Sequence, residues 1–158
     1  MKQRILLTLF ASLCALFSFA AGTEINGIHY YLNDNNMTAS VTYPETGAEK
    51  YKGDITIPSI ITYSYIEDNT VHYKYYTVTS IYSNAFSGCT GLTSITIPNS
   101  VTYIDEYAFQ GCTGLTNINI PNSVTRINDY AFNSCTGLTN ITIPNVTSMG
   151  ICVFQGCT

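Results

Sequence analysis

The chain has 158 residues, enough for one domain of ordinary size, with 46% hydrophobic and only 10% charged residues. This composition excludes a disordered protein, because disordered chains are poor in apolar residues and rich in charge. The formal net charge is −4. Such an acidic chain lacks the cationic surface that binds phosphates, so the charge argues against nucleic acid and anionic lipid as partners.

Residues 1–20 have the pattern of a secretory signal peptide. Lys2 and Arg4 give a positive start, an apolar run follows over 5–19, and small residues then mark a cleavage site after Ala20. The alternative, an uncleaved membrane anchor, is disfavoured because the run is shorter than the roughly 20 apolar residues that span a bilayer. We therefore expect an exported chain with no membrane insertion after cleavage. Without the leader, four basic residues face ten acidic ones, a formal charge of −6.

Residues 21–77 hold nine of the thirteen tyrosines and are predicted to form an N-terminal β-rich cap. Two strands are expected over 25–32 and 37–43, and a hairpin over 60–66 and 71–76. Between them, residues 54–59 copy the strand and proline of the repeats that follow, as a degenerate half repeat. A repeat array has an open, apolar first coil that must be covered, which favours a cap. The alternative is a separate ligand-binding β module.

From residue 78 onward the sequence repeats with a period of 23 residues. The blocks cover 78–100, 101–123 and 124–145, with a partial block at 146–158. One block cannot bury its own apolar side chains, whereas stacked neighbours can, so the sequence predicts an α/β-type repeat solenoid dominated by β structure. The residues predicted to form its core are Phe86, Cys89, Leu92, Ile95, Ile97, Phe109, Cys112, Leu115, Ile118, Ile120, Phe132, Cys135, Leu138, Ile141, Ile143, Phe154 and Cys157.

Each block also predicts its own local structure. Leu-x-x-Ile-x-Ile is typical of a short strand that points both isoleucines to one face, and the following proline ends it. Ala-Phe-x-x-Cys has the spacing of one helical or 3₁₀ turn. We expect Gly91, Gly114 and Gly137 to adopt positive φ in the turn back to the next strand.

The unit Ala-Phe-x-x-Cys-Thr-Gly-Leu-Thr-x-Ile-x-Ile-Pro-Asn-Ser-Val resembles the BspA-like class of bacterial leucine-rich repeats. The resemblance covers about half of the chain. It implies a leucine-rich repeat array in a secreted or surface protein of a bacterium. It also implies adhesion to a protein or glycan ligand, such as host matrix or another cell surface.

Five cysteines remain after the leader: Cys89, Cys112, Cys135, Cys152 and Cys157. One cysteine per coil, with coils about 4.8 Å apart, spreads four thiols over about 14 Å, too far for one metal ion. Disulfides between adjacent coils stay open, because the spacing and export permit them. A cysteine at one fixed place in each repeat nevertheless favours a small buried hydrophobe. Cys152 lies outside this register and is expected to be the exposed thiol.

Catalytic chemistry has no residues to support it. Nucleophilic catalysis needs a base beside a Ser, Thr or Cys. The two histidines, His29 and His72, instead lie among aromatic strand residues of the cap. Asp105 and Glu106 are neighbours in sequence and do not converge on one substrate atom. The sequence therefore predicts no enzyme, no metal and no cofactor.

Outward positions of the strands are the best candidates for binding. Six uncharged side chains flank the inward isoleucines: Ser94, Thr96, Asn117, Asn119, Asn140 and Thr142. Solenoids commonly bind ligands on such a face. The alternative is that these side chains bond to one another and only stabilise the coils. The same choice applies to the whole chain, which is either a recognition module or a structural segment with no ligand site of its own.

The last block stops at Thr158, before its strand. We expect the chain to be a fragment of a longer array. The alternative is that a partner, including a second copy of the chain, covers this end.

Overall fold

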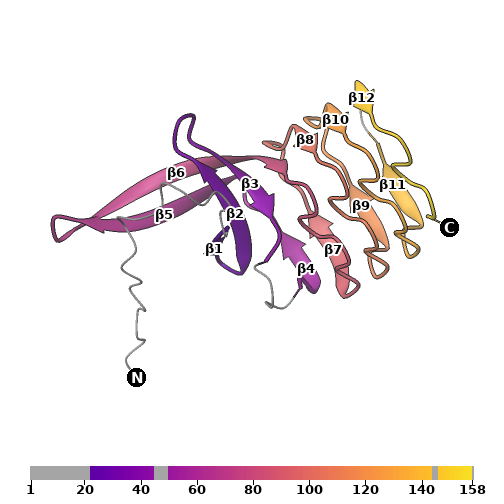
Figure 1. The fold of residues 1–158 in the computed structure, drawn as a ribbon, viewed down its shortest axis with the longest axis horizontal. Helices are drawn as coiled ribbons and strands as arrows, with labels where there is room; N and C mark the ends of the chain where they lie inside the picture. The colour runs from indigo at the N-terminus through magenta and orange to yellow at the C-terminus, as the bar shows by residue number, and fades with distance from the viewer. Residues whose placement is uncertain (1–21, 45–49, 144–145, 158) are drawn as a thin grey trace, which may run out of the picture.

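The computed structural model describes residues 22–44, 50–143 and 146–157, and the predicted signal peptide lies outside these residues. The described residues form twelve strands and no helix. The strands belong to two sheets (Figure 1). In the larger sheet the order is β1-β2-β3-β6-β8-β10-β12, with β5 paired to β6, and in the smaller it is β11-β9-β7-β4.

The described residues begin with three antiparallel strands, β1 (Thr23–Ile25), β2 (Ile28–Asn33) and β3 (Thr38–Thr42). The prediction of one strand over 25–32 is wrong, because Asn26 and Gly27 turn the chain between β1 and β2. Their φ values are 52° and 80°. Asn-Gly is the dipeptide that a two-residue hairpin turn favours, so the signal was present in the sequence.

A long hairpin follows, formed by β5 (Ile60–Glu67) and β6 (Thr70–Ile81). Asp68 and Asn69 form its turn, both with positive φ. The hairpin expected over 60–66 and 71–76 is therefore present, but its second strand runs further. The end of β6 pairs in parallel with β3 on one side and with β8 on the other. The free part of the hairpin projects from the body of the molecule (Figure 1).

Beyond the hairpin, the chain alternates between the two sheets. The larger sheet continues in parallel through β8 (Tyr103–Ile104), β10 (Arg126–Ile127) and β12 (Ser148–Met149). The smaller sheet is parallel throughout, with β4 (Gly53–Thr56), β7 (Leu92–Thr96), β9 (Asn117–Asn119) and β11 (Asn140–Thr142). We call one pass through a strand of each sheet a coil. Neighbouring coils lie side by side toward the C-terminus (Figure 1).

The single turn that Ala-Phe-x-x-Cys predicts is present, but the described residues contain no helix, so the α part of the expected α/β-type solenoid is wrong. The Cys89 N–H donates to the Phe86 carbonyl at 3.0 Å, as in a single i to i+3 turn. Other N–H groups point to the next coil: Phe86 N donates to Ala108 O at 2.7 Å and Gly88 N to Gln110 O at 2.6 Å. A continuing helix would use these donors within one segment. Bonding between coils therefore competes with helix formation and prevails.

The glycines before each strand serve a different purpose from the one expected. Gly91, Gly114 and Gly137 do not have positive φ, whereas Gly88 and Gly111 do. A Cβ placed on Gly114 would collide with the carbonyl oxygen of Thr90 in the preceding coil. Gly114 and Gly137 are needed because two backbones approach closely, and the expectation of positive φ is wrong for all three glycines.

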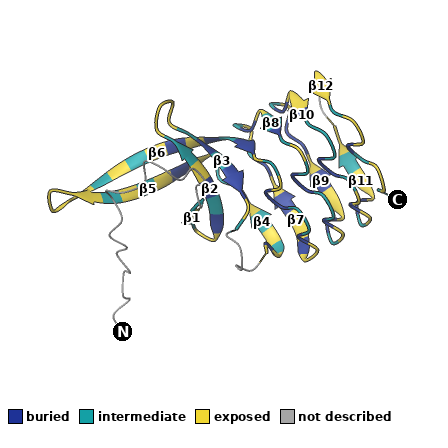
Figure 2. Ribbon diagram, viewed as in Figure 1, coloured by how far each residue is buried: buried dark blue, intermediate teal, exposed yellow. Residues whose placement is uncertain are grey.

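The core runs through the coils as a stack of phenylalanine rings. Phe86 and Phe109 lie 5.0 Å apart between centroids with an interplanar angle of 1°, and Phe109 and Phe132 lie 5.0 Å apart at 3°. Phe154 continues the stack at 5.5 Å. Most residues predicted to form the core are buried, while Ile141, Phe154 and Cys157 are half-buried. Figure 2 shows this buried interior between the two sheets.

Ile143 departs from the predicted core, since it is 39% exposed. It follows β11, which is an edge strand of the smaller sheet in the described part of the chain. Ile120, its counterpart one coil earlier, is buried at 2%. A neighbouring coil on both sides is what covers such an isoleucine.

Candidate functional site

The smaller sheet brings the six predicted binding residues together on one exposed surface. Its register places Asn117 beside Asn140, Thr96 beside Asn119, and Asn119 beside Thr142. All six side chains are exposed. Strand alternation explains this, because Ile118 points inward at 5% exposure between two outward asparagines.

The structure extends these rows to β4, which the sequence had assigned to the cap. Asp54 pairs with Ser94 and Thr56 with Thr96. Both added residues are exposed. We call the eight residues the candidate recognition face: Asp54, Thr56, Ser94, Thr96, Asn117, Asn119, Asn140 and Thr142. The signal for the two missed residues was available, because residues 54–58 copy the strand and proline of a repeat.

The asparagine amides on this face bond within their own coils. Asn117 Nδ2 donates to Thr116 Oγ1, and Asn140 Nδ2 donates to Thr139 Oγ1, both at 3.3 Å. Among the described residues, no hydrogen bond joins the side chains of Asn117 and Asn140 to each other. The side-chain amide oxygens of Asn117 and Asn140 can accept further hydrogen bonds, so they are available to a ligand or to water.

A shallow cavity lies between β9 and β11 on the candidate recognition face. Its volume is about 300 Å³, at the lower end of the range for small-ligand sites. It is lined by Asn117, Ile118, Asn119, Asn140, Ile141 and Thr142. Polar amides therefore lie beside apolar surface from the buried Ile118 and the half-buried Ile141, an arrangement that suits a ligand with both polar and apolar groups.

Asp54 places a carboxylate at one end of the face. Thr93 Oγ1 and Ser94 Oγ each donate to its Oδ1 at 2.7 Å. These two hydrogen bonds lower the pKa of Asp54 because they favour the charged carboxylate. The rest of the face is uncharged, so a ligand meets one fixed negative charge beside β7.

We expect NMR titration to find the pKa of Asp54 below the usual aspartate value of about 3.9. Because the pKa of Asp54 is lower in the folded than in the unfolded chain, its carboxylate stabilises the fold at pH values above the unfolded pKa. That contribution is lost as the pH falls through the folded pKa. Thr93→Val should raise the pKa of Asp54 toward its usual value, because one donor is lost. The matched change Thr116→Val, one coil away, should leave it unchanged, and equal effects would contradict this account.

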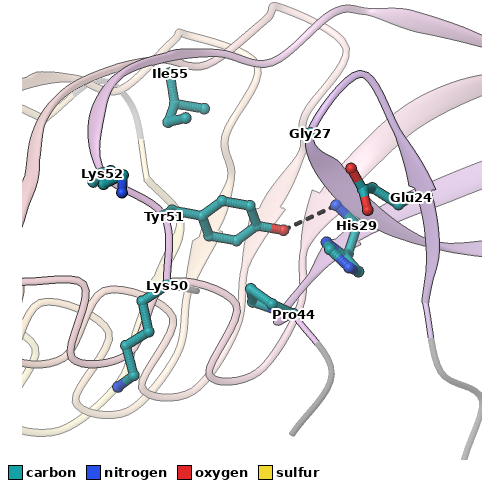
Figure 3. A pocket seen from close by; sticks show the side chains of 8 residues that line it. All are labelled: Glu24, Gly27, His29, Pro44, Lys50, Tyr51, Lys52 and Ile55. Carbon is teal, nitrogen blue, oxygen red and sulfur yellow. Dashed lines mark hydrogen bonds between the residues drawn. The ribbon is translucent and has the colours of Figure 1, made fainter. Parts of the chain in front are cut away.

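A second cavity of about 310 Å³ lies beside the first strands (Figure 3). Tyr51 crosses it, accepting a hydrogen bond from the His29 N–H and donating one to the Thr42 carbonyl, both at 2.9 Å. Burial raises the pKa of Tyr51 to about 12, so the phenol stays protonated. The lining residues are Glu24, Gly27, His29, Pro44, Lys50, Tyr51, Lys52 and Ile55. They include no Ser, Thr or Cys that His29 could activate, and the tyrosine joins the chain segments together.

His72 lies on the hairpin, where its ring stacks on Tyr65 at 5.3 Å between centroids. Asp105 accepts a hydrogen bond from Asn128 Nδ2 at 2.8 Å. Both residues take part in packing contacts rather than facing a shared cavity. The structure does not bring the two histidines together with each other or with Asp105.

All five cysteines of the described residues are free thiols, and four of them occupy one repeated place in the coils: Cys89, Cys112, Cys135 and Cys157. Cys112 Sγ donates to the Phe86 carbonyl at 3.1 Å and Cys135 Sγ to the Phe109 carbonyl at 3.0 Å. Burial raises the pKa of Cys89, which keeps its thiol neutral and weakly nucleophilic. Cys152 is exposed, as its position outside the register predicted.

The residues that the structure describes contain no group of three or more His, Cys, Asp or Glu side chains that could hold a metal ion. They also contain no helix with the length and apolar character needed to cross a membrane.

Comparison with known proteins identifies the family. Residues 56–158 match the BspA type leucine rich repeat region, with six copies. A search of the curated proteins found no match. The chain is 32% identical to a leucine-rich repeat protein from Bacteroides ovatus ATCC 8483, with a TM-score of 0.69 over 85% of this chain and 33% of that chain. It therefore spans about a third of the length of that protein.

Two other solved structures are similar. A leucine-rich repeat protein from Bacteroides capillosus ATCC 29799 is 30% identical, with a TM-score of 0.63 over 82% of this chain and 88% of that chain. The Treponema pallidum leucine rich repeat protein is 21% identical, with a TM-score of 0.59 over 86% of this chain and 67% of that chain, and shows the fold alone. With the family match extending over more than half of its length, the chain belongs to the BspA-type leucine-rich repeat family.

Proposed function

We propose that this chain is an exported recognition and adhesion module of the bacterial cell surface, which binds a protein or glycan through the candidate recognition face. The observation that carries the proposal is the alignment of exposed hydrogen-bonding side chains across four parallel strands. Leucine-rich repeat proteins typically mediate interactions rather than catalysis, and BspA-type members are typically bacterial surface proteins. Export rests on the signal-peptide pattern of residues 1–20.

The chemistry of the face favours a polar ligand without net negative charge. Its side chains recur at the strand spacing of about 4.8 Å and offer amide and hydroxyl groups. Asp54 would repel an anionic group at its end of the face and attract a cationic one. Hydroxyl-rich glycans and polar stretches of protein both meet these requirements.

We also propose that the coils form a solenoid of 23-residue repeats from residue 78 onward, covered by an N-terminal β cap over 21–77. The support is that paired residues of neighbouring coils, such as Ile118 and Ile141, lie 23 positions apart. In a solenoid the face grows with each added coil. A longer chain would then present a longer version of the same binding surface.

Binding to immobilised matrix proteins and mucin glycans, measured by surface plasmon resonance, tests the proposed function. We expect Asn119→Arg to weaken binding at least about tenfold, because a long cation would occupy the centre of the face. The matched control is Asn122→Arg, which places the same side chain on an exposed turn of the same coil. The control should bind like the wild type.

Two results would contradict the recognition role. Equal binding by both variants would show that another surface holds the ligand. Absence of binding by this chain, together with binding by a version extended with further repeats, would favour the alternative of a structural segment. In that case the ligand site would lie in a part that this chain lacks.

A further inference from the structure

The projecting hairpin presents an unpaired strand edge. In the described part of the chain, β5 pairs only with β6, and no strand lies along its other side. An exposed edge of this kind is a template for a further strand, and proteins commonly block it with lysine, proline or a bulge. β5 contains none of these, and its one charged residue is Glu67 at the tip. The edge is therefore open to pairing.

The hydrogen-bond register determines which backbone groups face outward. Val78 N donates to Ser59 O at 2.9 Å, which makes these opposed residues a hydrogen-bonded pair. Such pairs alternate along an antiparallel ladder, so every second residue of β5 bonds to β6. The intervening residues direct their N–H and C=O groups to the free edge. They are Ile60, Thr62, Ser64 and Ile66.

One face of the hairpin is apolar and uncovered. Five side chains on it are each 52–61% exposed: Ile60, Ile66, Val71, Tyr73 and Tyr75. A two-stranded ribbon is only marginally stable by itself in water, and further strands or a packed layer usually stabilise it. A partner strand on the free edge would therefore stabilise this hairpin.

The opposite face is already organised by internal contacts. Tyr65 stacks on Tyr63 and on His72, with centroids 6.3 Å and 5.3 Å apart. Lys74 Nζ lies 5.5 Å from the Tyr65 ring centroid and forms an ion pair with Asp34 at 3.0 Å. These contacts tie the hairpin to the turn between β2 and β3. The free edge is therefore held in a defined place before any partner arrives.

We propose that two copies of this chain associate by antiparallel pairing of their β5 strands about a two-fold axis at Tyr63. In this register Ile60 of one copy lies beside Ile66 of the other, and Thr62 lies beside Ser64. All four outward residues thereby gain hydrogen-bonded partners, and the two isoleucines cover each other.

Charge supports a second copy as the occupant. The chain is acidic overall, yet β5 and β6 together carry only Glu67 and Lys74, and Lys74 is paired with Asp34. In the proposed register Glu67 lies opposite Ser59 of the second copy, so no like charges face each other. Opposed like charges across a strand pair would be destabilising, and this edge has none. The proposal does not depend on the ligand of the candidate recognition face.

Sedimentation equilibrium with the full chain tests the association. We expect a monomer–dimer equilibrium for the wild type. Thr62→Lys with Ser64→Lys should raise the dissociation constant at least about tenfold, because lysines would then face each other across the axis. The matched control is Thr90→Lys with Thr113→Lys, which adds the same charge at exposed turns of the coils and should dimerise like the wild type.

Cross-linking tests the register. With Cys152→Ser as background, a Tyr63→Cys variant should form a disulfide-linked dimer on mild oxidation. Two copies of residue 63 would lie about 4.5 Å apart between Cα atoms, a distance that a disulfide spans. Tyr65→Cys in the same background should not cross-link, because the two copies of residue 65 would lie about 13 Å apart.

A wild-type chain that stays monomeric up to millimolar concentration would overturn the proposal. So would efficient cross-linking through residue 65 but not through residue 63. Circular dichroism of each variant establishes that a loss of association does not come from unfolding.

Discussion

Phe109→Ala is expected to lower the free energy of unfolding by about 3–5 kcal/mol, measured by urea denaturation. Phe109 is fully buried and lies between Phe86 and Phe132 in the ring stack, at 5.0 Å from each. Truncation removes the transfer free energy of the ring and leaves a cavity that neighbouring coils can fill only by shifting together. Backbone hydrogen bonds between the coils oppose such a shift, which places the loss in the upper part of the usual range.

The matched comparison is Phe154→Ala in the last coil. Phe154 is only half-buried and stacks on Phe132 alone among the phenylalanines. We expect it to cost about half as much, since less apolar area leaves water when that side chain packs. Equal losses at the two positions would contradict the account of a ring stack supported from both sides.

Gly114→Ala is expected to destabilise the fold by about 1–3 kcal/mol, as overpacking does. The φ of Gly114 is not positive, so alanine suits its backbone conformation and should by itself be favourable. The added Cβ would instead meet the Thr90 carbonyl, and the Leu92 carbonyl at 3.0 Å. Both are backbone atoms of the preceding coil, which cannot move away without breaking the ladder between coils.

Gly91→Ala is the control, because it occupies the same position one coil earlier. Its added Cβ would meet only Lys52, at 3.2 Å from the Cβ of that side chain and 3.8 Å from its Cα. Lys52 is exposed, and neither of these two atoms is a carbonyl oxygen. Thermal denaturation should show a clearly smaller loss than for Gly114→Ala. The reverse order would mean that close approach between coils is not the reason for these glycines.

The candidate recognition face illustrates how far sequence reasoning reached. Alternation within one strand places Asn117 and Asn119 on the opposite side from Ile118, and this local rule holds in the structure. The same rule could not show that Asp54, about forty residues earlier than Ser94, would join the row. The likeness of residues 54–58 to a repeat strand was the available signal, but direct pairing of β4 with β7 depends on how the chain returns after the hairpin.

The turns show a case in which a local pattern held but did not extend into a helix. The spacing of Phe86 and Cys89 suits a helical turn, and each such turn forms its i to i+3 bond. A helix does not follow, because the next coil offers carbonyl groups to the intervening donors. The glycine assignment failed for the same reason: Gly114 responds to the neighbouring coil rather than to its own φ.

The sequence by itself determined the repeat, its family and most of the interior, because Phe, Cys, Leu and Ile recur at positions that only stacked coils can bury. Only the tertiary structure decided that β4 extends the recognition face and that β5 has no second neighbouring strand among the described residues. Both depend on which strands meet across the sheet. Side-chain periodicity reports the face of a strand, whereas the identity of its neighbour is set by the path of the whole chain.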